Sequence, residues 1–169
     1  MPKTLADGRV KLTALTTKPA DVAAITITEL GAGTEAACSI NKSDYRLSAT
    51  GSTPITEQEM CRKGEGNTPG PTQYEGSVTP FWYLDETGQP DPAAMEVWDL
   101  LKTKGTTLWL VERDGPEEDV DWAEGDEYVV YEVVTDEPQV PTDRFTGFIK
   151  RIVPLGVQWK ETGVVAAGV

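Results

Sequence analysis

The segment Glu127–Thr135 (EYVVYEVVT) constrains the fold more than any other part of the chain. Nearly every residue from Tyr128 to Val134 is apolar or aromatic, so neither face of this segment is polar if it is extended. A strand of this kind is buried on both faces, inside a sheet that other elements cover. Its β-branched and aromatic residues favour a strand over a helix. The sequence therefore predicts a β-rich protein with layers packed around this strand.

Further segments of strand character are separated by Gly, Pro or polar breaks. Ala23–Leu30 alternates Ile25 and Ile27 with threonines, which is the period of a half-buried strand. A hairpin is predicted from Ala36–Ile40 and Tyr45–Thr50, with its turn at Asn41–Asp44, and a further strand at Ser77–Leu84. An antiparallel sheet region is predicted from the strands Thr106–Arg113, Glu127–Thr135, Arg144–Val153 and Leu155–Thr162.

One α-helix is predicted from about Pro92 to Lys104. Asp91 is suited to cap it, Pro92 fits the first helical position, and Gly105 can end it. Its apolar residues recur at helical spacing on one side, so we expect the helix to pack on the sheet.

Two segments lack the periodicity of a helix or a strand. Residues 1–20 are small, polar and mildly basic, and we expect an extended N-terminal arm. Residues 51–73 are interrupted by Gly and Pro, which predicts a long loop with a short strand or helix near residues 55–61. With 169 residues in the chain, residues 21–169 are expected to form a single β-rich domain.

The absence of histidine from the sequence excludes most familiar catalytic sites. Ser/His/Asp and Cys/His nucleophile systems and HExxH zinc sites all need that side chain. Carboxylate chemistry, oxygen-ligated metals, and a Lys or Tyr acting alone are what remain. We therefore predict no enzyme activity, no catalytic residue and no cofactor.

The acidic stretch Glu112–Glu127 is the best candidate for a cation site. Asp119 and Asp121 alternate as calcium ligands do, but a Gly and a distal Glu do not follow at EF-hand spacing. We expect a solvated acidic loop and no metal. Gly31–Ala36 matches a G-x-G-x-x-A pattern, but no alternation of strands and helices follows, so we expect a plain turn.

The net charge of −13 argues against a protein that grips nucleic acid, because such binding needs Lys and Arg on the phosphates. Cys38 and Cys61 can form a disulfide, contribute to a metal site or stay as free thiols, and we favour free thiols in a reducing cytoplasm. The sequence shows no secretory signal and no run of apolar residues long enough to span a membrane, so a soluble chain is expected.

The block Glu75–Gly115 has the order strand, turn, capped helix, strand. This order resembles the major tail tube proteins of long-tailed bacteriophages with flexible, non-contractile tails, and the similarity extends over roughly Asp21–Val165. Longer relatives carry an immunoglobulin-like domain after the last strand; we expect none in this chain, which puts a surface-adhesion role in doubt. That family has no catalytic signature.

The resemblance implies a fold and an assembly. The fold is mainly β (α+β), with two packed antiparallel sheets in a sandwich or barrel-like arrangement and one flanking helix. Copies of the chain would form hexameric rings, stacked into a hollow tube through which DNA passes without specific binding. Assembly in the host cytoplasm is implied, together with tape measure, tail terminator and baseplate proteins as partners.

Candidate residues follow from that assembly. Trp122 is singled out because it lies in the acidic loop, whereas the other tryptophans are expected in the core. The candidates for facing the lumen are Glu127, Glu132, Asp143, Lys150 and Arg151. The candidates for contacts between subunits are Arg9, Lys11, Glu57, Arg62, Lys63, Glu65 and Trp122.

Two other functions compete with the tail tube. A head-to-tail joining or tail terminator protein would form one ring and stop. An acidic β-sandwich that binds carbohydrate or calcium would be a monomer whose melting temperature rises with its ligand.

Overall fold

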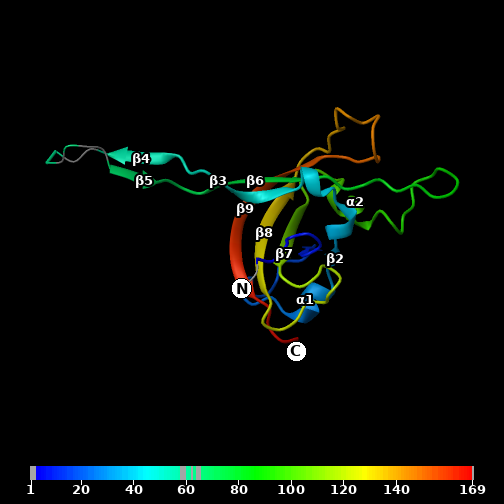
Figure 1. Ribbon diagram of the computed structural model, residues 1–169, viewed down its shortest axis with the longest axis horizontal. Helices are drawn as coiled ribbons and strands as arrows, with labels where there is room; N and C mark the ends of the chain where they lie inside the picture. Colours follow the sequence, from blue (N-terminus) through cyan, green and yellow to red (C-terminus); the bar gives the residue numbers. More distant parts are fainter. Residues whose placement is uncertain (1–2, 58–59, 62, 64–65, 169) are drawn as a thin grey trace.

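The computed structural model describes residues 3–57, 60–61, 63 and 66–168. Its main element is a seven-stranded antiparallel sheet of order β2-β1-β7-β8-β9-β6-β3 (Figure 1). The strands are β1 (Val10–Leu15), β2 (Thr34–Glu35), β3 (Arg46–Thr50), β6 (Gln73–Val78), β7 (Thr107–Asp114), β8 (Glu127–Thr135) and β9 (Val153–Val164).

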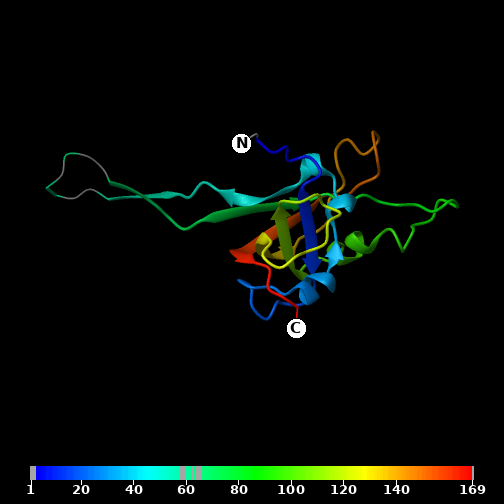
Figure 2. The same ribbon diagram turned by 60° about the horizontal axis from the view of Figure 1, so that its bottom comes forward.

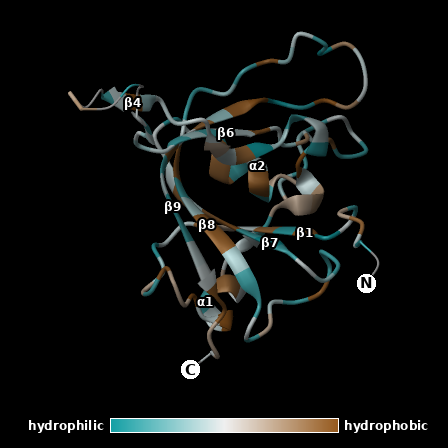
Figure 3. Ribbon diagram, turned by 60° about the vertical axis from the view of Figure 1, so that its left-hand side comes forward, coloured by the Kyte–Doolittle hydropathy of each residue, from teal (hydrophilic) through white to brown (hydrophobic). Residues whose placement is uncertain are grey.

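β8 lies at the centre of the sheet. It pairs with β9 from Glu127 to Thr135 and with β7 from Val129 to Val134. The register with β9 shifts between Glu132 and Val133, an irregularity of the kind that increases the local twist of a sheet. The sheet is strongly curved, and β9 forms a long arc along it (Figures 1 and 3).

The hollow of this curve contains the larger core. The helix α2 (Glu96–Leu101) lies within it, with β6 on one side and β1 and β7 on the other (Figure 3). Val97 and Leu101 of α2 are buried against the sheet. Full burial of one such side chain contributes roughly 1.5–3 kcal/mol. The sheet residues of this cluster are Leu12, Ala14, Leu47, Val78, Leu108, Leu110, Tyr131, Val133, Val153 and Leu155.

The opposite face of the sheet carries a second core. There Val111 and Val130 pack with Ile25 and Leu30, which belong to the segment around the helix α1 (Ile27–Gly31). Both faces of β8 are therefore covered, as the apolar run in its sequence predicts.

Residues 51–57 and 66–72 leave the body of the protein as a long projection (Figures 1 and 2). Within it, β4 (Pro54–Glu57) and β5 (Gly66–Pro69) form a separate two-stranded antiparallel ladder. The residues of both strands are exposed, and Ile55 keeps 53% of its surface accessible. An isolated two-stranded ladder is marginally stable in water, so this projection lacks the packing that stabilises the body.

The mainly β class with a flanking helix is confirmed. In place of two packed sheets, the structure has one sheet that curves around α2 and a small ladder that projects from it. No helix among the described residues is both long and apolar enough to cross a membrane.

The predicted strand Ala23–Leu30 is wrong, because its second half is α1. Thr26 caps this helix: its hydroxyl accepts from the Glu29 N–H, and the Glu29 carboxylate accepts from the Thr26 N–H. This capping box satisfies two backbone donors locally, which an extended strand could not do.

The arm predicted for residues 1–20 is also wrong for Val10–Leu15. These residues form β1, which pairs with β7 along its whole length and is buried from Lys11 onward. The strand was obscured by Lys11, whose charge interrupts the apolar pattern.

The predicted hairpin of Ala36–Ile40 and Tyr45–Thr50 is right only in its second half. Its first half is a 3₁₀ turn, η1 (Ala37–Ser39), and a second such turn, η2 (Lys42–Asp44), follows. The strand β3 then pairs with β6, not with the preceding segment.

The predicted helix is longer than the observed α2, which begins at Glu96. Asp91 caps only an earlier turn, in which its carboxylate accepts from the Ala93 N–H. The helix ends at Leu101 with Lys102 as its C-cap, so Gly105, at φ +84°, lies in the turn beyond the helix and does not end it as predicted.

Two predicted strands are shorter than expected or absent. Only Ser77 and Val78 of the predicted strand Ser77–Leu84 lie in a strand, β6, which begins earlier, at Gln73. Residues 144–152 form a projecting loop, and β9 begins only at Val153. This loop leaves Phe145 and Phe148 exposed, so the apolar residues of the segment do not mark a buried strand.

Candidate assembly surfaces

The two ends of the sheet carry strand edges that could pair with another chain. Within the described residues, β3 pairs with β6 alone. At the other end, β2 pairs only with Thr13 and Ala14, so it covers only part of β1. Such edges present N–H and C=O groups to any strand that approaches.

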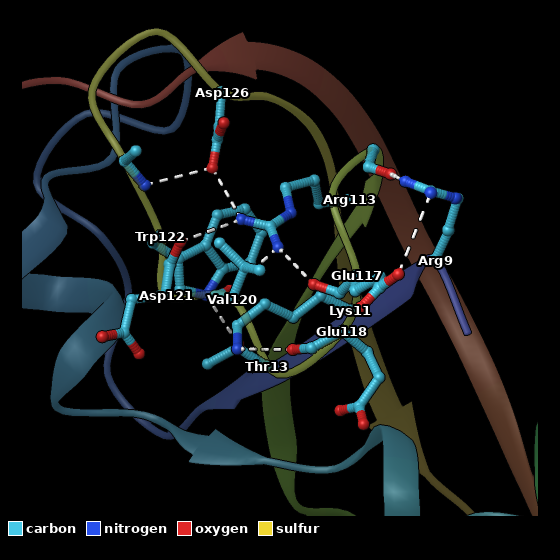
Figure 4. A network of polar contacts seen from close by, with 12 residues as sticks. Arg9, Lys11, Thr13, Arg113, Glu117, Glu118, Val120, Asp121, Trp122 and Asp126 are labelled. Atoms are coloured by element: carbon cyan, nitrogen blue, oxygen red, sulfur yellow. Dashed lines mark hydrogen bonds and ion pairs between the residues drawn. The ribbon is translucent and has the colours of Figure 1, made fainter.

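The acidic loop between β7 and β8 is held by Arg113, which is 1% exposed (Figure 4). Its Nη1 donates to Asp126 Oδ2 at 2.7 Å and to the Asp121 carbonyl at 3.2 Å. Its Nη2 donates to the carbonyls of Glu117 and Val120, at 3.2 and 2.9 Å. One buried guanidinium thus fixes the path of the loop at four points.

Trp122 and Lys11 lie within the same network. Trp122 is 7% exposed, donates from Nε1 to Thr13 Oγ1 at 2.9 Å, and lies under the Arg113 guanidinium at 5.1 Å. Lys11 is 5% exposed and donates to the Glu118 carbonyl at 3.0 Å. Both side chains are buried and hydrogen-bonded within the subunit, so neither is available for a contact with a neighbouring copy.

The other candidates for subunit contacts are spread over the chain. Arg9 donates to the Gly115 carbonyl at 3.2 Å and is half-buried. Glu57, at the end of β4, and Lys63 are exposed on the projection. Arg62 and Glu65 lie outside the described residues.

The two lumen candidates on β8 face opposite sides of the sheet. Glu132 lies five positions after Glu127, and side chains alternate along a strand, so the two point to opposite faces. Glu132 is half-buried and accepts from Trp159 Nε1. Glu127 is exposed at the start of the strand. A single surface of the sheet cannot present both carboxylates.

The other lumen candidates lie together in the loop that precedes β9. Lys150 Nζ lies 3.7 Å from Asp143 and 3.4 Å from Asp44. The Arg151 guanidinium lies 5.4 Å from the centre of the Trp82 ring. These basic side chains are therefore engaged within the subunit.

A groove of about 550 Å³ opens between the start of β1 and the turns η1 and η2. At one side of it the Tyr45 hydroxyl donates to Glu112. Burial raises the pKa of Tyr45, with a further contribution from the Glu112 charge. Burial also raises the pKa of Glu112, although the Tyr45 hydrogen bond acts in the opposite direction.

The acidic loop shows no metal-binding geometry. In the described ranges, no group of three or more Cys, His, Asp or Glu side chains could hold a metal ion. Asp121 gives its carbonyl and Asp126 its carboxylate to Arg113. Cys38 and Cys61 are exposed free thiols.

A protein-family model described as a phage tail tube protein matches residues 1–168. The chain belongs to the phage tail tube protein family. No curated protein matched the sequence. The family match confirms the resemblance drawn from Glu75–Gly115 and identifies the chain as a structural component of a bacteriophage tail.

Sequence reasoning missed Arg113, the residue that organises the acidic loop of this tail tube protein. A signal was present, because Trp109, Val111 and Arg113 share one face of β7. A cation on an apolar strand face, directly before an acidic loop, indicates a buried ion pair.

We predict that Arg113→Met destabilises the subunit by about 3–5 kcal/mol, because it removes four hydrogen bonds and leaves the carboxylate of Asp126 without its cation. Denaturant unfolding followed by tryptophan fluorescence measures this loss. Arg46→Met is the matched control, since the Arg46–Glu75 pair is exposed and its loss costs about 1 kcal/mol or less. Equal effects of the two substitutions would contradict the assigned role of Arg113.

Glu112→Gln is predicted to change how stability depends on pH. A raised pKa in the folded state means that wild-type stability falls as pH rises from the unfolded pKa, about 4.3, through the folded pKa. Glutamine lacks this titration, so the free energy of unfolding of the variant, relative to that of the wild type, should increase as pH rises above about 4.3. Denaturant titrations across this range test it, and a constant difference would be the contrary result.

Proposed function

We propose that this tail tube protein forms hexameric rings that stack into a hollow tube, through which phage DNA passes to the host. The open ends of the curved sheet carry the proposal. β-Augmentation between neighbouring copies would join these edges and close the sheets of a ring into a barrel without free edges. Assembly would take place in the host cytoplasm, with tape measure, tail terminator and baseplate proteins as further partners.

The projecting ladder β4–β5 is proposed to connect successive rings. Its residues are exposed in the single subunit, and its strands contact little besides each other. Burial against a neighbouring ring would provide the packing that the ladder lacks. A head-to-tail contact of this kind does not close on itself and therefore generates a filament. The N-terminal residues that precede β1 are proposed to contribute to the same contact.

The lumen is proposed to bear net negative charge, consistent with the net charge of −13. Carboxylates on the wall would repel DNA phosphates and keep the duplex from adhering. Salt limits the range of this repulsion to about 8 Å, so it acts close to the wall. Of the two acids on β8, Glu127 is the better candidate because Glu132 is engaged by Trp159.

Excision of residues 54–69, with Thr53 joined to Gly70 through an Asn-Gly turn, is predicted to abolish tubes. The subunit should still fold, because Gly70 N–H already donates to the Thr53 carbonyl at 3.1 Å and β3 continues to pair with β6. Negative-stain electron microscopy of the wild type and the variant, with circular dichroism as the folding control, tests this.

Three results of that experiment are informative. Tubes of normal length from the folded variant would refute the role of the ladder. Wild-type rings that never stack would instead favour a joining or terminator protein. A wild type that stays monomeric with its tail partners present would overturn the proposed function.

The charge of the lumen is tested by Glu127→Lys in virions that still assemble. The substitution would place positive charge beside the passing phosphates, so DNA release triggered in vitro should be slower than in the wild type. Glu86→Lys makes the same charge change in the exposed loop before α2 and serves as control. Equal release rates in all three virions would exclude Glu127 from the lumen.

A further inference from the structure

The loop of residues 139–152, here called the Phe loop, exposes large aromatic side chains. Phe145 is 91% and Phe148 81% exposed, although the chain has only 3 phenylalanines. Exposed apolar groups that gather on one segment mark an interaction site more often than single ones do. The Phe loop is therefore a candidate contact surface distinct from the sheet edges and from the ladder.

The Phe loop is also basic within an acidic protein. It contains Arg144, Lys150 and Arg151 but only one acid, Asp143, whereas the chain as a whole has a net charge of −13. Lys150 lies near Asp143 and Asp44, so its charge is partly compensated at the base of the loop. Arg144 lies over the Phe145 ring at 5.4 Å and brings positive charge to the tip.

The base of the Phe loop is fixed to the body, so its tip projects away (Figure 1). Trp82 N–H donates to the Ile149 carbonyl at 2.8 Å. Gln139 and Ile152 exchange backbone hydrogen bonds of 2.7 and 2.9 Å. With its two ends held in this way, the tip is presented to another molecule.

The groove beside β1 has the complementary character. Its apolar wall includes Val10, Leu12 and Ile40, and its volume of about 550 Å³ is within the range of pockets that hold aromatic groups. Its acidic groups are Glu118, Glu112 and Asp7, and Lys42 pairs with Asp7 at 2.6 Å. The remaining charge in the groove is therefore negative.

We propose that the Phe loop of one copy docks into the groove of a second copy. The phenyl rings would cover the apolar wall, and Arg144 would meet Glu118. Aromatic and arginine side chains are the residues most enriched at the centres of protein interfaces. Because loop and groove are different surfaces, the contact is heterologous and can be repeated from copy to copy around a ring.

The ladder fits this groove less well. Residues 51–73 contain three acids and two bases, Glu57, Glu59, Glu65, Arg62 and Lys63, so they bring net negative charge to a negative groove. The docking of the Phe loop rests on the proposed function in one respect, namely that copies of the chain associate.

The native Cys38 allows a direct test, because it is exposed and lines the groove. Phe145→Cys is introduced together with Cys61→Ser, and the concentrated protein is oxidised with diamide. Docking predicts a disulfide between Cys38 of one copy and the new thiol of another, seen as dimers and longer chains on non-reducing gels and located by peptide mass spectrometry.

Two control proteins make this test specific. Adding Cys38→Ser must abolish the product. Thr87→Cys with Cys61→Ser places a thiol in the exposed loop before α2, and it should give far less of that product. Equal crosslinking from position 87, or none from position 145 in a sample that forms rings, would overturn the proposal.

A charge exchange tests the polar part of the contact. Arg144→Glu and Glu118→Lys should each weaken association by about tenfold or more, measured by sedimentation velocity, and the double variant should recover most of it. Glu118→Lys leaves intact the backbone contacts of Glu118 with Gly8 and Lys11.

The outcomes separate this contact from the proposed function. Rings that form normally in both single variants overturn the docking contact and leave tube formation standing. Specific crosslinking without rings or tubes retains the contact and overturns the tube. A wild type that does not associate, together with a Phe145→Cys protein that does not crosslink, overturns both.

Discussion

The structure depends on β8, whose backbone pairs on both sides and whose faces are both covered. Tyr131 and Val133 face the hollow with α2, whereas Tyr128 and Val130 face α1 and the acidic loop. A strand without a polar face cannot lie at the surface, so other elements must pack on each of its two faces. On one face, α2 packs in the hollow of the curved sheet. On the other face, the segment around α1 and the acidic loop pack against β8.

The packing on the face opposite α2 requires Arg113. The loop between β7 and β8 is acidic, and such a sequence would by itself favour solvent over a hydrophobic core. The guanidinium of Arg113 compensates Asp126 and takes up three loop carbonyls, which brings Trp122 onto the sheet. A buried cation is costly when it is isolated, and here its hydrogen bonds and the Trp122 ring offset that cost. The charge of Arg113 thus allows the acidic loop to pack on the apolar face of the sheet, although the composition of the loop favours exposure to solvent.

The sequence predicted secondary structure correctly where the signal lies in neighbouring residues. The prediction failed where contacts between residues distant in the chain determine the structure. β8 was predicted with its observed bounds because its apolar run has one interpretation. The strand predicted at Ala23–Leu30 failed because the Thr26–Glu29 capping box outweighs the alternation of isoleucines. β1 was missed because Lys11 is buried against the Glu35 carboxylate and the Glu118 carbonyl, two contacts that the local sequence does not show. Trp122 is predicted at an interface for the same reason, since Thr13, which accepts its hydrogen bond, is distant in sequence.

Self-association of so acidic a chain must overcome repulsion between copies. At physiological salt this repulsion decays over about 8 Å, so it opposes approach but loses importance between surfaces in contact. Short-range interactions can then decide the outcome: backbone hydrogen bonds at the edge of β3, and burial of exposed apolar groups such as Phe145 and Phe148. Because neither depends on net charge, the surfaces of the proposed tube could remain acidic. In that tube, the same negative charge would keep DNA off the wall without weakening the contacts between subunits.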